Sequence, residues 1–124
     1  MILLQAVTAY IAIQQLMERE MDYESAHALL VTKNRLKEHA EFYLREEQKL
    51  AQTYGERDKE GRVVFDERGR FRMADEAAAQ EYARKRAELA AVAVEDAPEP
   101  VTVRKIDRIT PAQIEALTDI IRFE

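Results

Sequence analysis

The sequence predicts a mainly α-helical protein of the α+β class, built around one hydrophobic core. Apolar residues recur at helical spacing over most of the chain. The 124 residues include 19 alanines but only three glycines and three prolines, so strong helix formers are abundant and helix breakers are rare. The length matches a single domain. We therefore expect three longer helices, a small β-hairpin between the second and the third, an extended arm and a short C-terminal helix.

The first expected helix runs from residue 2 to about residue 19. Its apolar residues cover about two thirds of the helix circumference, because the polar residues keep to one narrow line. A single neighbouring helix cannot cover so wide a surface. The first helix is therefore either the central helix of the fold or an interface between copies. Its main apolar stripe consists of Leu3, Val7, Tyr10, Ile13 and Met17.

A second, long helix is expected from a break at residues 20–22 to Tyr54. No glycine or proline interrupts it before Gly55, and either Asp22 or Ser25 can cap its start. At 1.5 Å per residue this helix is roughly 45 to 50 Å long, which exceeds the diameter of a compact domain of this size. It should therefore project from the core or be covered by a second copy.

A charged connector, residues 56–61, leads to a β-hairpin expected at about residues 62–73. The stretch from Asp66 to Gly69 has the residues that a tight turn prefers at its first and fourth positions. We detect no internal repeat. Strand alternation divides the hairpin into a cationic face and an apolar face. The cationic face carries Arg70 and Arg72, and the apolar face carries Val63, Phe65, Phe71 and Met73.

A third helix is expected from about residue 74 to about residue 92, paired with the long helix as a helical hairpin. Its alanines allow the two helix axes to approach closely. We expect residues 1–94 to form the helical domain. Residues 95–124 then form an extended arm and a short helix, which either belong to the same domain or exchange with a second copy.

The C-terminal helix has the most complete start signal in the chain. Thr110 is the expected N-cap, Pro111 occupies the first helical position, and Gln113 completes a capping box. We expect this helix to continue through Ile121. The preceding arm, with apolar residues at Val101, Val103, Ile106 and Ile109, is expected to be extended and partly buried.

The composition disfavours several classes of function. A net charge of −5 argues against general binding to nucleic acid, because that binding mode needs a basic surface. The chain has no cysteine, which excludes a thiolate nucleophile and cysteine-bound zinc and suits a reducing cytoplasm. The sequence shows no targeting segment and no membrane span.

The sequence also lacks a recognisable catalytic or metal-binding set. Its two histidines, His27 and His39, lie on one helix about 18 Å apart, so they cannot share a metal ion. Ser25 is the single serine and has no glycine-flanked turn that would make it a nucleophile. The carboxylates alternate with Lys and Arg as on a solvated helix face. We therefore expect no enzyme activity, no cofactor and no metal.

One group of residues suggests a binding site on the hairpin. Arginine beside aromatic rings is suited to holding a phosphate, a base or a protein partner. The alternative is that these arginines form cross-strand ion pairs that protect the hairpin edges. The candidate site for a partner or a small anionic ligand comprises Tyr54, Arg62, Arg70, Phe71 and Arg72.

Self-association is the second expectation about binding. The first helix and the C-terminal arm together present more apolar surface than one chain of this length readily covers, so we expect a homo-oligomer. The candidate interface residues are Leu3, Val7, Tyr10, Ile13, Ile114, Leu117 and Ile121.

Four segments give the chain a resemblance to a known family. They are residues 4–10, Tyr54 to Glu56, the hairpin rich in Asp and Gly, and residues 109–117. With these segments the chain resembles, over nearly its whole length, a small family of uncharacterised proteins encoded by tailed phages and prophages. No catalytic residue is established in that family. The resemblance implies a phage origin, a location in the host cytoplasm or in the virion, and a role other than catalysis.

Two functions follow as expectations. The first is a phage-encoded binding protein that acts by contact with a host or phage protein, as an accessory of virion assembly or as an inhibitor of a host defence factor. The second is an oligomeric protein that sequesters a small anionic ligand such as a signalling nucleotide.

Overall fold

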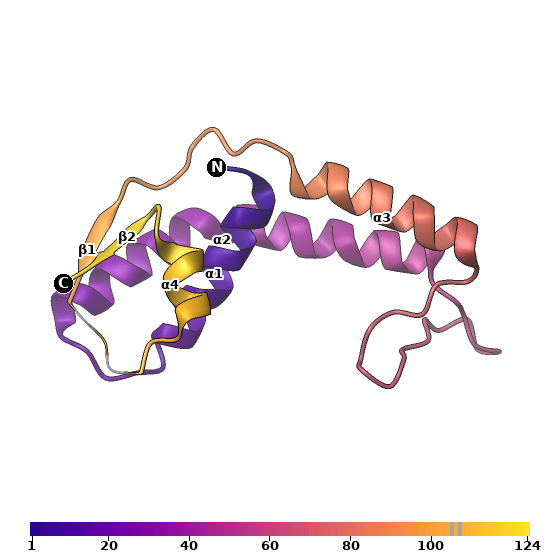
Figure 1. Ribbon diagram of the computed structural model, residues 1–124, viewed down its shortest axis with the longest axis horizontal. Helices are drawn as coiled ribbons and strands as arrows, with labels where there is room; N and C mark the ends of the chain where they lie inside the picture. The colour runs from indigo at the N-terminus through magenta and orange to yellow at the C-terminus, as the bar shows by residue number, and fades with distance from the viewer. Residues whose placement is uncertain (105, 107) are drawn as a thin grey trace.

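One long helix, α2, determines the shape of the molecule (Figure 1). The computed structural model describes residues 1–104, 106 and 108–124. Its elements are α1 (Leu3–Leu16), α2 (Tyr23–Tyr54), α3 (Glu76–Ala90), β1 (Val101–Val103), α4 (Pro111–Leu117) and β2 (Ile121–Phe123). The first half of α2 belongs to the core, and the second half pairs with α3 to form a projecting arm. The mainly α class with a small β element is confirmed.

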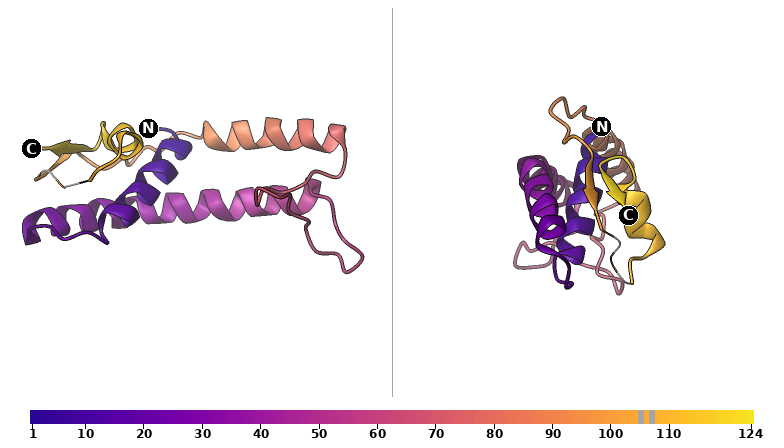
Figure 2. Two further views of the ribbon diagram at one scale, coloured as in Figure 1. Left: turned by 60° about the horizontal axis from the view of Figure 1, so that its bottom comes forward. Right: turned by 90° about the vertical axis from the view of Figure 1, so that its left-hand side faces the viewer.

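Helix α1 is the central helix of the core. It lies between α2 on one side and the C-terminal elements on the other (Figure 2). Residues next to its start are anchored by the chain beyond α3, since the amide of Leu3 donates to the Val92 carbonyl over 2.8 Å and that of Val94 to the Met1 carbonyl over 2.9 Å. Its wide apolar surface is therefore covered within one chain.

Helix α2 begins at Asp22, whose carboxylate accepts the Ser25 amide over 3.1 Å. This N-cap is one of the two that the sequence predicts. The helix runs for 32 residues, and its buried side chains face first α1 and then α3. It ends at Gly55, whose amide donates to the Ala51 carbonyl over 2.7 Å. A side chain on Gly55 would collide with that same carbonyl oxygen, which explains a glycine at a position with the ordinary φ of −73°.

Helix α3 runs antiparallel to the second half of α2, as the sequence predicts (Figure 2). Asp75 caps it by accepting the Ala78 amide over 2.7 Å. None of the 15 residues described for α3 is buried. The arm is thus a two-helix structure with one thin contact surface, in contrast to the layered core.

The C-terminal segment packs on α1 and α2 of its own chain. The predicted capping box is present, with the Gln113 amide on the Thr110 hydroxyl at 3.2 Å and the Thr110 amide on the Gln113 side chain at 3.0 Å. The helix ends at Leu117, and not at Ile121 as predicted. After a turn at residues 118–120, β2 is extended and forms a parallel pair with β1, in which Val101 lies opposite Ile121.

The prediction of a self-association surface is wrong for five of its seven residues. Leu3, Val7, Ile13, Leu117 and Ile121 are all at most 5% exposed, because α1, α2 and the C-terminal segment cover one another. These side chains form the hydrophobic core. Of the other two, Tyr10 is partly buried and Ile114 is 44% exposed. Among the described residues, no helix has both the length and the apolar character that crossing a membrane requires.

Candidate functional site: a cleft at the tip of the arm

Two turns built on the same sequence pattern form the tip of the arm. Residues 58–62 and 66–70 both follow the pattern Asp-X-X-Gly-Arg. In each turn one oxygen of the aspartate accepts two backbone amides, from Glu60 and Arg62 in the first and from the equivalent residues in the second, at 2.9 to 3.0 Å. The glycines have φ of +80° and +76°, which glycine adopts without strain. The sequence therefore does contain a short internal repeat, with a period of eight residues.

The two turns connect three extended segments that close on one another. Three backbone hydrogen bonds form a closed cycle. The Glu56 amide donates to the Arg72 carbonyl at 2.7 Å, the Arg72 amide to the Val64 carbonyl at 2.9 Å, and the Val64 amide to the Glu56 carbonyl at 2.9 Å. The charged connector is therefore the third segment of the tip. Within residues 55–73, all of which the structure describes, only isolated bridges form and no regular strand does. The hairpin predicted at 62–73 is present as two of these segments, joined by the bridge of Phe65 with Phe71 and by the Asp66 amide on the Arg70 carbonyl at 2.7 Å, and the connector adds the third segment.

The bridges determine which side chains share a face. Phe65 lies opposite Phe71, and Arg57 lies opposite Val63. The two phenylalanine rings are 4.9 Å apart at 33°, a tilted pair. The bridge agrees with the predicted apolar face, to which both phenylalanines belong. Residues directly opposite in such a pair point to the same side, so these four side chains lie together on the side of the tip that faces α2.

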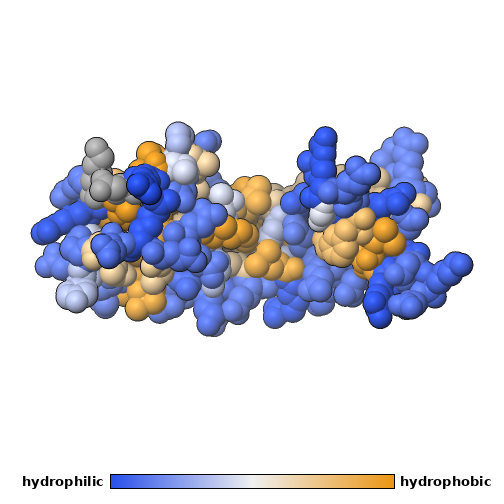
Figure 3. Space-filling view, turned by 90° about the horizontal axis from the view of Figure 1, so that it is seen from below, coloured by the Kyte–Doolittle hydropathy of each residue, from blue (hydrophilic) through white to orange (hydrophobic). Residues whose placement is uncertain are grey.

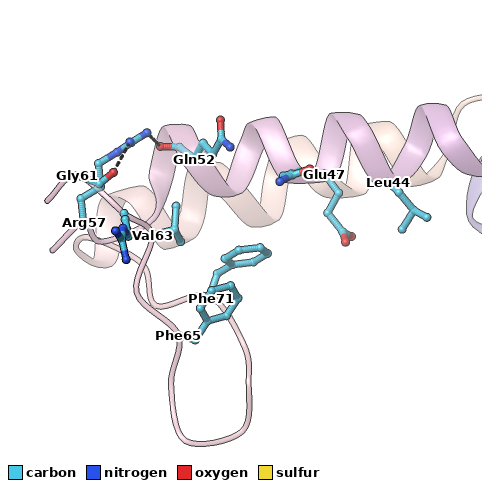
Figure 4. A pocket seen from close by; sticks show the side chains of 10 residues that line it. Leu44, Glu47, Gln52, Arg57, Gly61, Val63, Phe65 and Phe71 are labelled. Atoms are coloured by element: carbon cyan, nitrogen blue, oxygen red, sulfur yellow. Dashed lines mark hydrogen bonds between the residues drawn. The ribbon is translucent and has the colours of Figure 1, made fainter.

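A cleft of about 670 Å³ lies between this face and α2 (Figure 4). Its apolar surface comes from both elements. Leu44 on α2 is 45% exposed and Phe65 on the tip is 56% exposed. The size is sufficient for several side chains of a partner or for one small molecule. The lining residues are Leu44, Glu47, Gln48, Gln52, Arg57, Gly61, Arg62, Val63, Phe65 and Phe71.

Two arginines place positive charge at the rim of the cleft. Arg57 donates to the Gln52 carbonyl and, over 3.0 Å, to the Gly61 carbonyl, and these two hydrogen bonds fix the position of its guanidinium group. Arg62 is mostly exposed and lies 3.3 Å from Glu60. Glu47, the acid that lines the cleft, pairs with Arg86 of α3 at 2.9 Å. The described lining therefore carries two cationic side chains, and its single acidic side chain is paired with Arg86.

The pair of Glu47 and Arg86 also belongs to the contact between α2 and α3. Burial is the main cause that raises the pKa of the Tyr43 phenol, which is 3% exposed. Burial raises the pKa of Tyr82 as well, and the charge of Glu47 adds to the shift. For Arg86, burial opposes the charge, but the hydrogen bond to Tyr43 and the charge of Glu47 together hold its pKa above the usual value. The arm is thus held together partly by polar groups.

The structure brings together two of the five predicted site residues. Arg62 and Phe71 line the cleft, whereas Arg70 and Arg72 do not, and Arg72 pairs with Glu56 at 3.3 Å. Tyr54 is partly buried at the end of α2 and is absent from the lining. Sequence reasoning missed the residues of α2, because nothing in the helical pattern shows where the tip folds back. The candidate set also omits Arg57, which directly precedes the first unit of the eight-residue repeat.

Comparison of the chain with protein families, with curated proteins and with solved structures finds no match. The resemblance to the phage family therefore stays a prediction. Among the described residues, no group of three or more histidine or carboxylate side chains is placed to hold a metal ion.

Proposed function

We propose that this protein acts by protein–protein contact, without catalysing a reaction, and that the cleft at the tip of the arm makes that contact. The observation that supports the proposal is the exposure of Phe65 beside Leu44 in a shared apolar cleft. Exposed apolar patches rimmed by polar groups mark interaction sites in soluble domains. Aromatic residues and arginine, both present here, are enriched among the residues that dominate binding energy.

The shape of the molecule supports the same function. Helix α2 has 32 residues and is about 48 Å long at 1.5 Å per residue. Its second half holds the tip well away from the core (Figure 1). The arm buries few of its own side chains, so its contribution to folding is small. A partner can reach the tip without contacting the core, and we expect that partner to be a phage or host protein.

Site-specific photocrosslinking in cells tests the proposal. We expect a photoreactive phenylalanine at position 65 to form covalent adducts with protein. The same group at Tyr23, which is 93% exposed on α2 far from the tip, serves as the control. Adducts of equal yield at both positions, or none at position 65, would contradict a contact made by the tip.

A small anionic ligand is the second candidate, because Arg62 lies beside the phenylalanine pair. Its support is weaker. Arg57 is already bound to two carbonyl oxygens, Arg62 faces Glu60, and Arg70 and Arg72 lie outside the cleft. Thermal unfolding with a panel of nucleoside phosphates tests it. A rise in Tm that Arg62→Gln abolishes would favour this ligand, and an unchanged Tm for the whole panel would eliminate it.

A further inference from the structure

A second apolar depression lies in the other half of the molecule, between α1 and α4. Its volume is about 430 Å³. The groove exists because α4 has only seven residues and presents the small side chains of Ala112 and Ala116 toward α1. Leu4 in its wall is 42% exposed although it belongs to the helix at the centre of the core. Its lining includes Met1, Leu4, Ala112, Glu115, Ala116 and Asp119.

The charge of this groove is opposite to that of the cleft at the tip. Glu115 and Asp119 supply its ionisable side chains, and no Lys or Arg appears among the described residues that line it. Neither carboxylate takes part in an ion pair with any residue that the structure describes. The groove therefore combines an apolar floor with two carboxylates at its rim, and the α-amino group of Met1 is the positive group in its lining.

The tip and the groove are complementary and cannot meet within one chain. The tip presents Phe65, with Arg57 and Arg62 beside it. The space-filling view shows an apolar patch among charged side chains at this end of the molecule (Figure 3). The tip and the helices α1 and α4 occupy opposite halves of the long axis (Figure 1). The length of α2 keeps them apart.

We propose that the tip of one copy docks into the groove between α1 and α4 of a second copy. This inference rests on the proposed function, since it names a partner for the same tip. Phe65 then contacts the apolar wall formed by Leu4 and Ala116, while Arg62, whose pair with Glu60 is exposed and therefore weak, approaches Glu115. Charge complementarity favours a second copy as the occupant, because arginine side chains line the cleft at the tip and only acidic side chains carry charge among the described residues that line the groove.

Docking of this kind is head to tail, because the two contacting surfaces differ. Each copy then keeps one free tip or one free groove, so association continues beyond two copies until a ring closes or a filament grows. The surfaces are small compared with the roughly 800 Å² per partner of a stable interface. We therefore expect weak association that depends on protein concentration.

Sedimentation velocity of the purified full chain provides the first measurement. Between about 10 μM and about 1 mM, a range suited to weak interfaces, we expect species larger than a dimer to appear. Higher salt should reduce them, because the paired charges are exposed. A protein that stays monomeric over this range, or that stops at a symmetric dimer, overturns the inference.

Mixing two variants gives the sharpest test. Phe65→Ser removes the apolar contact of the tip and leaves the groove unchanged. Leu4→Ser removes the apolar wall of the groove and leaves the tip unchanged. Each variant alone should remain monomeric. A mixture of both should form 1:1 dimers and nothing larger, because one functional tip and one functional groove are present. A mixture that stays monomeric overturns head-to-tail docking.

Matched controls separate a lost contact from a damaged fold. Leu30→Ser changes a leucine with the same 42% exposure as Leu4, and Tyr23→Ser removes an exposed aromatic residue outside both surfaces. Both controls should associate like the wild type. Arg62→Glu should weaken association several-fold, and combination with Glu115→Arg should restore it. Failure of that restoration counts against the paired charges.

The two proposals fail in different ways. If photocrosslinks at position 65 join the chain to another protein while the purified chain stays monomeric, the contact function stands and the second copy is ruled out as its partner. If neither crosslinks nor association depend on position 65, both proposals are wrong.

Discussion

At the scale of single residues, the three glycines illustrate two different reasons for the absence of a side chain. Gly61 and Gly69 have positive φ, and a Cβ added to either would meet no other atom within 4 Å. Their constraint is conformational. Gly55 has an ordinary φ, and its constraint is contact with the Ala51 carbonyl oxygen and with Val63, whose Cγ1 would lie 3.2 Å from an added Cβ.

These reasons predict different outcomes for the same substitution. Gly69→Ala should lower the free energy of unfolding by about 1 to 2 kcal/mol, the cost of a left-handed conformation for alanine, and should leave the cleft in place. Gly55→Ala forces the backbone where α2 meets the tip to shift, so we expect it to move Val63 and alter the cleft. Chemical denaturation measures the first effect, and NMR shifts of Val63 and Phe71 report the second. Shifts of the same size in both variants would contradict this distinction.

At the scale of elements, the contact between α2 and α3 depends on neutral phenols. Burial raises the pKa of Tyr43 and of Tyr82 above the ordinary value of 10.0. The folded state therefore holds these protons more tightly than the unfolded state. The resulting stabilisation is fully present below pH 10.0 and is lost as the pH rises through the folded-state pKa.

The arm should accordingly lose stability in alkaline solution. We expect Tm to fall as the pH rises above about 10, and Tyr82→Phe to make that fall less steep because phenylalanine cannot ionise. Circular dichroism of thermal unfolding measures both profiles. Tyr23→Phe, at a tyrosine that is 93% exposed outside the arm, should follow the wild-type profile. An identical pH profile for Tyr82→Phe would show that Tyr82 does not couple to folding.

The sequence predicts elements well where the determining signals are local. The cap at Thr110, the end of α2 at Gly55 and the separation of Phe71 from the flanking arginines all depend on neighbouring residues. The predicted end of α4 is wrong, because residues 121–123 suit a helix or a strand until β1 is present to pair with them. The closed tip escapes prediction for the same reason, since its three segments bond over distances of eight and sixteen residues.

The cleft and the core are hard to predict because they depend on long-range packing. Leu44 looks like any exposed leucine of a charged helix until the tip folds beside it. The apolar stripe of α1 indicates an interface between copies, yet α2 and the C-terminal segment cover it. A wide apolar helix face shows that cover is needed, but not which chain provides it.

At the scale of the whole molecule, stability should be distributed unevenly. The core layers α1 between α2 and the C-terminal segment, and Ile13 and Leu16 are fully buried there. In the arm, none of the residues described for α3 is buried. Local opening requires least free energy where few apolar contacts are lost. The arm should therefore open without the core, a property suited to a segment that adjusts to a partner.

Amide hydrogen exchange tests this division directly. We expect α3 to exchange much faster than α1 in the wild type. Ile13→Ala should lower the free energy of unfolding by about 2 to 5 kcal/mol, as expected for a large side chain lost from a packed core. Protection of α1 and of the first half of α2 should fall by that amount, while α3 should keep its wild-type exchange rates because its amides exchange through local opening. If α3 instead loses protection in parallel with α1, the arm opens only when the core unfolds, and the tip is then a rigid extension of the core.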